Sequence, residues 1–229
     1  AAAAARAPPR AAAPAAGADS AAGRIHDRPL TSWRVRWQHR YATEPWLFGR
    51  APNLYLRSLD CRLPRAGRAL CLGEGEGRNA VWLARRGLAV TAVDFAPAAL
   101  ARARSLAAEH GVAVETLEAD VARWRAPEAA FDLVTLIFLQ LSPDERVPAH
   151  RAAMAALAPG GLLVLEAFAK GDRLACGPRS DDSRYDEAML RADFAGLEIL
   201  ELLTGTVALE EGEGHRGPAR VVRLFARRG

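Results

Sequence analysis

Cysteine, lysine and long apolar runs are scarce in this chain of 229 residues. Its three cysteines, Cys61, Cys71 and Cys176, are scattered, which excludes a disulfide scaffold. They form no CxxC pair and no Cys/His cluster with zinc spacing, so we expect chemistry without a metal. No stretch of about 18 uncharged apolar residues occurs, which argues against a membrane anchor. We therefore predict a cytoplasmic globular protein with no membrane partner.

Positive charge is concentrated at the front of the chain. Residues 1–50 carry eight arginines against three acidic residues, whereas residues 51–229 carry 23 basic and 24 acidic residues. Extended nucleic-acid surfaces need a basic face that displaces counterions from phosphates. The main part of the chain has no surplus of positive charge, so we expect no nucleic-acid partner.

Composition divides the chain into an extension and one domain. Alanine makes up 14 of the first 22 residues, and residues 1–30 lack caps and apolar periodicity, which predicts a disordered Ala/Pro/Arg-rich extension. An organelle transit peptide is the weaker alternative for this segment. We expect residues 31–229 to form a single domain, composed of an N-terminal arm (31–60), a cofactor-binding core (68–168), and a lid with closing strands (169–229).

From Arg68 onward, short apolar runs alternate with helical patterns, which is typical of an α/β sheet. This alternation predicts a seven-stranded, doubly wound, Rossmann-like sheet, mostly parallel with an antiparallel final strand. Ligands of such sheets bind at the carboxyl ends of the strands. The predicted strands are 69–72, 89–93, 112–117, 131–138, 162–168, 197–207 and 219–226, and the predicted helices are 54–59, 79–86, 97–110, 144–157 and 186–194.

Glycines at alternate positions follow the first predicted strand, at Gly73, Gly75 and Gly77. They suit a sharp turn at which a ligand lies against bare main chain. Dinucleotide enzymes carry G-x-G-x-x-G, but Arg78 holds the place of the last glycine here, and two glutamates in the turn are poor neighbours for a pyrophosphate. The turn therefore favours a ligand with a positive centre over a nicotinamide, although by itself it fits a purely structural turn as well.

Two acidic residues end the next two predicted strands. Asp94 lies 21 positions after Gly73, the distance at which a carboxylate accepts hydrogen bonds from ribose hydroxyls, and Phe95 offers an apolar face beside it. Asp120 could accept from the exocyclic amine of adenine. The structural alternatives are a helix cap for Asp94 and a solvated turn residue for Asp120. Together, the three strand ends indicate one adenosine-bearing ligand.

Residues 68–168 resemble a class I S-adenosylmethionine-dependent methyltransferase. The turn 73–77 is similar to the first motif of that family, Asp94 to its second, Asp120 to its third, and 157–162 to its L-x-P-G-G signature. The run 75–80, the segment 46–53 and the tail 213–228 resemble the tellurite-resistance and thiopurine methyltransferase-like branch. The resemblance implies S-adenosyl-L-methionine as cofactor and S-adenosyl-L-homocysteine as product. The implied cofactor-binding residues are Gly73, Glu74, Gly75, Gly77, Asn79, Asp94, Phe95, Asp120, Val121 and Ile137.

The chain departs from the family at two positions. Cys71 stands where the family usually has an acid that supports the glycine turn, and Gln140 stands where members of the branch often have histidine. We expect Glu74 or Glu76 to substitute for the missing acid. Cys61 and Cys71 are predicted to be small buried residues, and His150 to lie on a helix surface.

The region expected to face the methyl acceptor is almost wholly apolar, over 137–141. A soft nucleophile needs little help from a base, whereas an alcohol or phenol needs one with a tuned pKa. No Asn- or Asp-Pro-Pro-aromatic motif, expected for exocyclic amines of nucleobases, is present. We therefore expect a small-molecule acceptor that is soft (a thiol, selenium or tellurium species) or small and apolar.

The polar candidates on the acceptor side are His215, as a base, and Arg216, as the holder of an anion; a solvated hairpin loop is the alternative for this segment. Tyr41 and Phe48 are candidate covers of the cofactor, with core packing as their alternative. The rival functions are a cofactor-binding sensor or degenerate methyltransferase, an NAD(P)-dependent oxidoreductase, and a nucleic-acid methyltransferase. The expected assembly is a monomer or homodimer.

Overall fold

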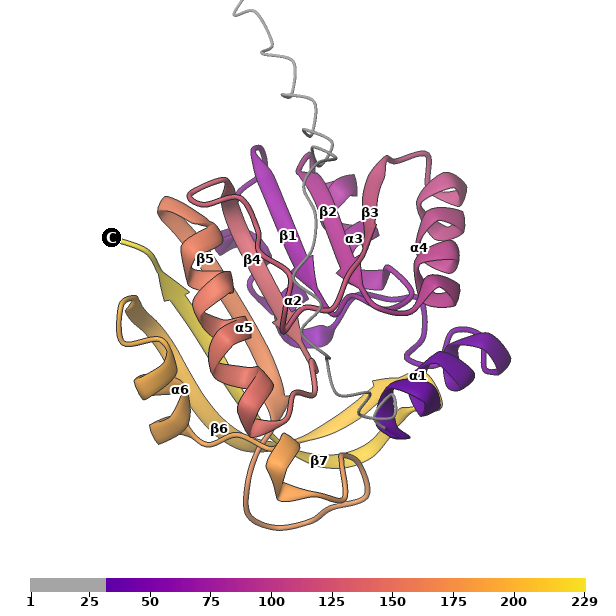
Figure 1. Cartoon of the computed structure of the whole chain (residues 1–229), viewed down its shortest axis with the longest axis vertical. Coiled ribbons are helices and arrows are strands. Elements are labelled where there is room, and N and C mark those ends of the chain that lie inside the picture. Colours follow the sequence, from indigo (N-terminus) through magenta and orange to yellow (C-terminus); the bar gives the residue numbers. More distant parts are fainter. Residues whose placement is uncertain (1–31) are drawn as a thin grey trace, which may run out of the picture.

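A computed structural model describes residues 32–229, so the extension predicted over 1–30 lies outside the described residues. Seven strands form one sheet in the order β3-β2-β1-β4-β5-β7-β6 (Figure 1). The first five strands pair in parallel, and β7 pairs antiparallel with both β5 and β6. The prediction of a mostly parallel sheet with an antiparallel final strand is confirmed. The strands are β1 (Arg68–Leu72), β2 (Ala89–Asp94), β3 (Val114–Glu118), β4 (Phe131–Ile137), β5 (Leu157–Phe168), β6 (Glu198–Glu211) and β7 (His215–Arg227).

The central strands β1, β2, β4 and β5 are buried on both faces, as their apolar sequences require, whereas the edge strands β3 and β6 are partly exposed. Successive side chains of a strand point to opposite faces, so Leu70 and Leu72 of β1 join one core while Ala69 and Cys71 join the other. Helices α5 and α6 pack on the first core, and α2 and α3 on the second. The helices are α1 (Ser32–Thr43), α2 (Leu54–Ser58), α3 (Arg78–Arg85), α4 (Pro97–Glu109), α5 (Pro143–Ala156) and α6 (Glu187–Asp193), with short 3₁₀ turns at Asp60–Arg62 and Asp181–Ser183.

The front of the domain differs from the prediction, because Ser32–Thr43 forms helix α1 where no regular element was expected. Its sequence alternates Trp33, Val35 and Trp37 with arginines, a period of two that suits a strand better than a helix. Burial of one side overrides that pattern, since Tyr41 packs with Leu47 and with residues of α4.

The final two strands are longer than predicted and meet in a tight turn at 212–214. The β6–β7 hairpin therefore reaches across the carboxyl ends of the sheet toward α1 (Figure 1). Gly214 N donates to Leu47 O over 2.8 Å, which joins the tip of the hairpin to the N-terminal arm. Strand β5 also begins earlier than expected, at Leu157, because Gly160 and Gly161 exchange backbone hydrogen bonds with Arg228 across an irregularity at Gly160, which has φ of +77°.

Two predictions of burial are wrong. Cys61 is exposed, because it lies in the 3₁₀ turn after α2. His150 is buried rather than on a helix surface, because the face of α5 that carries it packs against Phe194 of α6. Its Nδ1 lies 2.8 Å from Asp193 Oδ2, so the polar edge of the ring is satisfied inside the protein.

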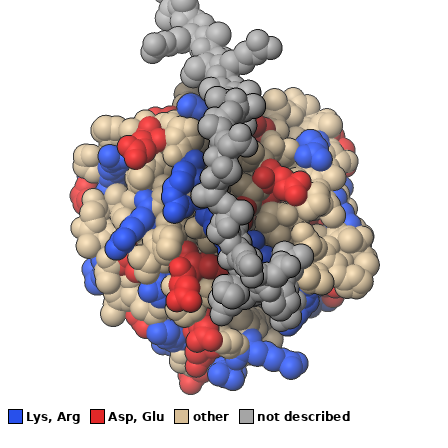
Figure 2. All heavy atoms as spheres, viewed as in Figure 1, with Lys and Arg blue, Asp and Glu red and all other residues tan. Residues whose placement is uncertain are grey.

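The surface carries mixed charge. On the face shown in Figure 2, arginine side chains are interspersed with acidic ones and with uncharged residues. Within residues 32–229, no helix has the length and apolar character needed to cross a bilayer.

Candidate functional site

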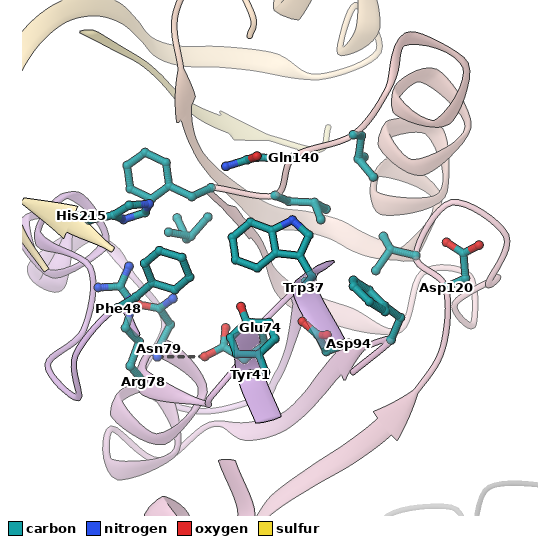
Figure 3. Close-up of a pocket in the computed structure, with 17 residues that line it drawn as sticks. Trp37, Tyr41, Phe48, Glu74, Arg78, Asn79, Asp94, Asp120, Gln140 and His215 are labelled. Atoms are coloured by element: carbon teal, nitrogen blue, oxygen red, sulfur yellow. Dashed lines mark hydrogen bonds between the residues drawn. The ribbon is translucent and has the colours of Figure 1, made fainter. Parts of the chain in front are cut away.

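One cavity lies at the carboxyl ends of β1, β2 and β4 and encloses about 810 Å³, including the part open to solvent. Figure 3 shows Asp94 and Asp120 toward one end, His215 with Phe48 toward the other, and Trp37 and Tyr41 of α1 over the middle. The predicted site residues that line the cavity are Gly73, Glu74, Asn79, Asp94, Phe95, Asp120, Val121, Ile137, Tyr41, Phe48 and His215; those outside its lining are Gly75, Gly77 and Arg216.

The glycine turn brings bare main chain to the cavity. Gly73 and Gly75 both have φ of +64° and Gly77 has φ of +88°, a left-handed conformation that favours glycine. A Cβ on Gly73 would lie 2.5 Å from Leu139 Cδ1 in the cavity wall. A Cβ on Gly77 would lie 2.7 Å from the Cα of Ala103, so this glycine permits the close approach of α3 and α4 and does not itself face the cavity.

Glu74 caps helix α3 from inside the turn. Its Oε1 accepts hydrogen bonds from Asn79 N (2.9 Å) and Ala80 N (2.8 Å), which serve the first turn of the helix because the N-cap, Gly77, has no side chain (Figure 3). Burial raises the pKa of Glu74 to about 7. Burial also raises the pKa of the Cys71 thiol behind it. Glu74 thus supplies a carboxyl group to the turn in a chain that has cysteine at the usual acidic position.

Asp94 joins the glycine turn to the second strand end. Its Oδ2 accepts from Gly75 N (2.8 Å) and its Oδ1 from Ala96 N (2.9 Å), just before α4. Burial raises the pKa of Asp94 to about 6. A carboxylate has about four lone-pair sites, so Asp94 retains capacity for a ligand. The N-cap of α4 is Ala96 and has no side-chain cap, so Asp94 fixes the turn before the helix and does not cap the helix itself. The predicted role as a hydroxyl acceptor is compatible with this geometry.

Asp120 lies at the rim beside α1. Its Oδ1 accepts from Ala122 N (3.1 Å), and its Oδ2 accepts from Arg34 Nη2 (2.7 Å). Arg34 also donates to Glu145 Oε1 (3.3 Å), so one arginine of α1 spans the mouth between the turn after β3 and helix α5. Asp120, at the third strand end, therefore lines the cavity and also binds helix α1, which covers the cavity.

Glu76 serves the arm instead of the cavity. Its two carboxylate oxygens accept from Trp46 N and Leu47 N, each over 2.7 Å, and Arg102 adds an ion pair at 2.8 Å. These bonds fix the turn before Phe48, in which Trp46 has φ of +56°. The turn places Phe48 in the cavity lining. Of the two glutamates expected to substitute for the missing acid, Glu74 bonds to the start of α3 beside the glycine turn, whereas Glu76 bonds to the N-terminal arm.

A buried polar network that sequence reasoning missed lies behind the cavity. Arg78 Nη2 donates to Glu211 Oε2 (2.7 Å), and Glu211 Oε1 accepts from Asn53 Nδ2 (3.0 Å). Asn53 Nδ2 also donates to Glu166 Oε2 (2.5 Å), whose other oxygen accepts from Arg223 Nε (2.7 Å). Arg78 lines the cavity, and its Nη1 is buried with no hydrogen-bond partner among the described residues. Arg78 thus brings a buried guanidinium with one unsatisfied N–H group to the cavity wall.

His215 is buried, not part of a solvated loop. Its ring centroid lies 4.3 Å from that of Phe48, 4.4 Å from that of Phe138 and 5.4 Å from that of Phe168. Burial among these rings lowers the pKa of His215, so the imidazole is neutral near pH 7. Because it begins β7, the histidine is aimed at the cavity, while its neighbour Arg216 points outward and pairs with the exposed Glu213 (2.8 Å).

Other parts of the lining had no motif to reveal them. Trp37 comes from the unpredicted helix α1, and Phe138, with φ of +51°, and Leu139 come from the loop after β4. Gln140, noted in the sequence as a departure, lines the same wall. Among residues 32–229, no group of three or more His, Cys, Asp or Glu side chains is arranged to hold a metal ion.

Comparison with known proteins identifies the domain. A family described as "Methyltransferase domain" matches residues 69–161. Demethylmenaquinone methyltransferase of Thermus thermophilus is 39% identical over 115 residues, which cover 49% of this chain and 52% of that protein. Thiocyanate methyltransferase 1 of Arabidopsis thaliana is 27% identical over 174 residues, covering 74% of this chain and 75% of that protein.

The fold has counterparts among solved structures. TehB from Haemophilus influenzae superposes with a TM-score of 0.63 at 20% identity, covering 76% of this chain and 61% of that chain, and so shares the fold. The chain spans about half the length of the Thermus relative. The family match shows that residues 69–161 form a methyltransferase domain, and the likeness to TehB shows that the chain shares the fold of that structure.

Proposed function

We propose that this protein transfers a methyl group from S-adenosylmethionine to a small molecule with a soft nucleophile, such as a thiol, selenium or tellurium species, or to a small apolar acceptor. One observation carries the proposal. The cavity joins the three strand ends to a chamber walled by Phe48, Phe138, Leu139 and a neutral His215. We expect no nucleic acid or membrane partner; the face shown in Figure 2 carries basic and acidic side chains interspersed.

The residues present fit the cofactor. Asp94 would accept from the ribose hydroxyls and Asp120 from the exocyclic amine of adenine, while Phe95 and Val121 supply apolar contact. Gly73 lies in the cavity lining, with the Leu139 side chain packed against it. The unpartnered Nη1 of Arg78 would receive the carboxylate of the amino-acid moiety. When bound, the cofactor supplies a methyl group activated by its sulfonium.

The chain's own task is then to position the acceptor and exclude water. Trp37 and Tyr41 close the middle of the cavity, and Phe48 and Phe138 enclose the chamber around His215. A neutral imidazole can accept or donate one hydrogen bond without presenting a charge. This environment suits a soft or apolar acceptor, which needs orientation more than deprotonation.

The names of the relatives agree with such acceptors. The Arabidopsis protein is named for thiocyanate, whose sulfur is soft, and the Thermus protein for demethylmenaquinone, a largely apolar molecule. The proposal includes the tellurite-resistance and thiopurine methyltransferase-like branch, which the glycine turn and the tail resemble. The likeness to TehB supports this part of the proposal.

Two measurements test the proposal. Calorimetry should show S-adenosylhomocysteine binding in the micromolar range and no binding of NAD. A screen of thiols, chalcogen oxyanions, thiopurines and a demethylated quinone should then yield S-adenosylhomocysteine with at least one of them. Binding without turnover would favour the alternative of a cofactor-binding sensor. Fast methylation of RNA or of a protein would contradict the proposed acceptor class.

A further inference from the structure

The carboxylate of Glu211, at the end of β6, lies where the two ends of the cavity come together. Its Oε2 accepts from Arg78 Nη2 (2.7 Å) and lies 3.6 Å from His215 Nδ1. Its Oε1 accepts from Asn53 Nδ2 and from Leu54 N, each over 3.0 Å. Both oxygens are therefore occupied, and the side chain is only 3% exposed.

Each of the two groups on Oε2 lines a different part of the cavity. Arg78 begins α3 beside the glycine turn, and its Nη1 is the buried donor without a partner among the described residues. His215 begins β7 directly opposite Glu211 in the antiparallel register, and its ring lies in the chamber with Phe48 and Phe138. We call the part of the cavity at the glycine turn, Asp94 and Asp120 the donor end, and the part around Phe48, Phe138 and His215 the acceptor end. One carboxylate thus lies against a residue beside the donor end and a residue of the acceptor end.

Stability alone is a weak reason for this arrangement. Replacing a buried ion pair with well-packed apolar residues is often neutral or stabilising, because the charges must be desolvated. Burial by itself would raise the pKa of Glu211, but the nearby His215 imidazole, the charge of Arg78 and the hydrogen bond from Leu54 N lower it to about 2. The carboxylate therefore stays ionised. It holds Arg78 by a hydrogen bond and lies 3.6 Å from His215 Nδ1, a buried nitrogen that has no hydrogen-bond partner among the described residues.

We propose that Glu211 is a positioning residue that fixes the Arg78 guanidinium and the His215 imidazole in one arrangement, so that filling the donor end of the cavity orders the acceptor end. The inference rests on the proposed function, because Arg78 is assigned there to the carboxylate of the cofactor. Neither Arg78 nor Glu211 touches the reacting atoms in this scheme, and Glu211 acts only through its neighbours.

The test compares two ligands that differ at the group Arg78 would bind. S-adenosylhomocysteine carries the amino-acid carboxylate, whereas 5′-methylthioadenosine lacks it. In Glu211→Gln, the neutral amide holds Arg78 less firmly, so affinity for S-adenosylhomocysteine should fall about tenfold while affinity for methylthioadenosine stays within about twofold. Glu210→Gln is the matched control, because Glu210 is the adjacent residue of β6 and is exposed. It should leave both affinities unchanged.

A second readout follows His215 directly. In the wild type, the imidazole ¹⁵N resonances, assigned with a His215→Gln variant, should shift more with S-adenosylhomocysteine than with methylthioadenosine. That difference should disappear in Glu211→Gln. If Glu211→Gln fails to fold, Glu211→Asp keeps the charge but shortens the reach, and it should show the same selective loss on a smaller scale.

The outcomes separate the two hypotheses. Failure of the wild type to bind S-adenosylhomocysteine would sink the proposed function itself. Wild-type binding with equal losses for both ligands in Glu211→Gln, with no loss at all, or with a His215 response that persists, would overturn the positioning role and leave the proposed function standing.

Discussion

The two ends of the cavity are built in different ways. The donor end is compact in sequence, between Gly73 and Asp120, and its carboxylates bond to backbone N–H groups of neighbouring turns. The acceptor end is assembled from α1, the turn at Phe48, the loop after β4 and the β6–β7 hairpin, which interact through side chains and through hairpin–arm contacts. The donor end is therefore fixed by the sheet and its adjoining turns, whereas the acceptor end forms only while segments distant in sequence stay packed against one another.

The largest effect is expected where the donor end loses its central carboxylate. Asp94→Ala removes the acceptor of Gly75 N and Ala96 N and the proposed acceptor of the ribose. We expect S-adenosylhomocysteine affinity to fall at least about 100-fold by calorimetry. Asp132→Ala is the control, because Asp132 also accepts a backbone N–H, from Arg68, but at the opposite end of the sheet. Equal affinity losses in both variants would contradict the assignment.

A smaller effect is expected at the junction of the two ends. Gly75→Ala places a Cβ about 2.7 Å from the Tyr41 hydroxyl, on a backbone with φ of +64°. Gly111→Ala has φ of +65° with nothing within 4 Å, so it reproduces the backbone strain without the contact. Both should lose about 1–2 kcal/mol of stability, but only Gly75→Ala should weaken S-adenosylhomocysteine binding, by about tenfold. Adding Tyr41→Phe should restore part of that loss; no restoration would show that Tyr41 does not cover the turn.

A substitution at the acceptor end should affect catalysis more than it affects cofactor binding. His215→Gln should lower kcat/KM for the acceptor about tenfold, because the ring completes the chamber with Phe48 and Phe138, while S-adenosylhomocysteine affinity changes less than about threefold. Arg216→Ala, at the next position but exposed, should leave both parameters unchanged. A loss of activity in Arg216→Ala would show that this arginine takes part in acceptor binding or catalysis, as the sequence suggested.

The last effect, on stability and not on ligand binding, concerns pH at the donor end. Because burial raises the pKa of Glu74 from 4.5 to about 7, the contribution of this group is fully present below pH 4.5 and is lost as pH rises through 7. Glu74→Gln keeps an oxygen for Asn79 N and Ala80 N but cannot lose a proton. Its Tm should therefore rise relative to the wild type between pH 5 and pH 8, by a few degrees, corresponding to about 1–3 kcal/mol. A constant difference across this range would contradict a buried, titrating Glu74.

The contrast between the ends also explains what the sequence could predict. The glycine turn, Asp94 and Asp120 follow short apolar strands, so local pattern and strand order suffice to bring them together. Helix α1 escaped prediction because alternating arginines masked its buried side. The Arg78–Glu211 pair joins residues 133 positions apart and leaves no local pattern. His215 could be named from the tail, but its burial depends on the full length of the β6–β7 hairpin.

The central claim is that three strand ends hold the adenosine of S-adenosylmethionine. A crystal structure with S-adenosylhomocysteine tests it most directly. We predict ribose hydroxyls on the Asp94 carboxylate, the adenine amine within hydrogen-bond distance of Asp120, and the ligand carboxylate on Arg78. Adenosine bound elsewhere, or a cavity in which Asp94 faces no ligand, would contradict the account.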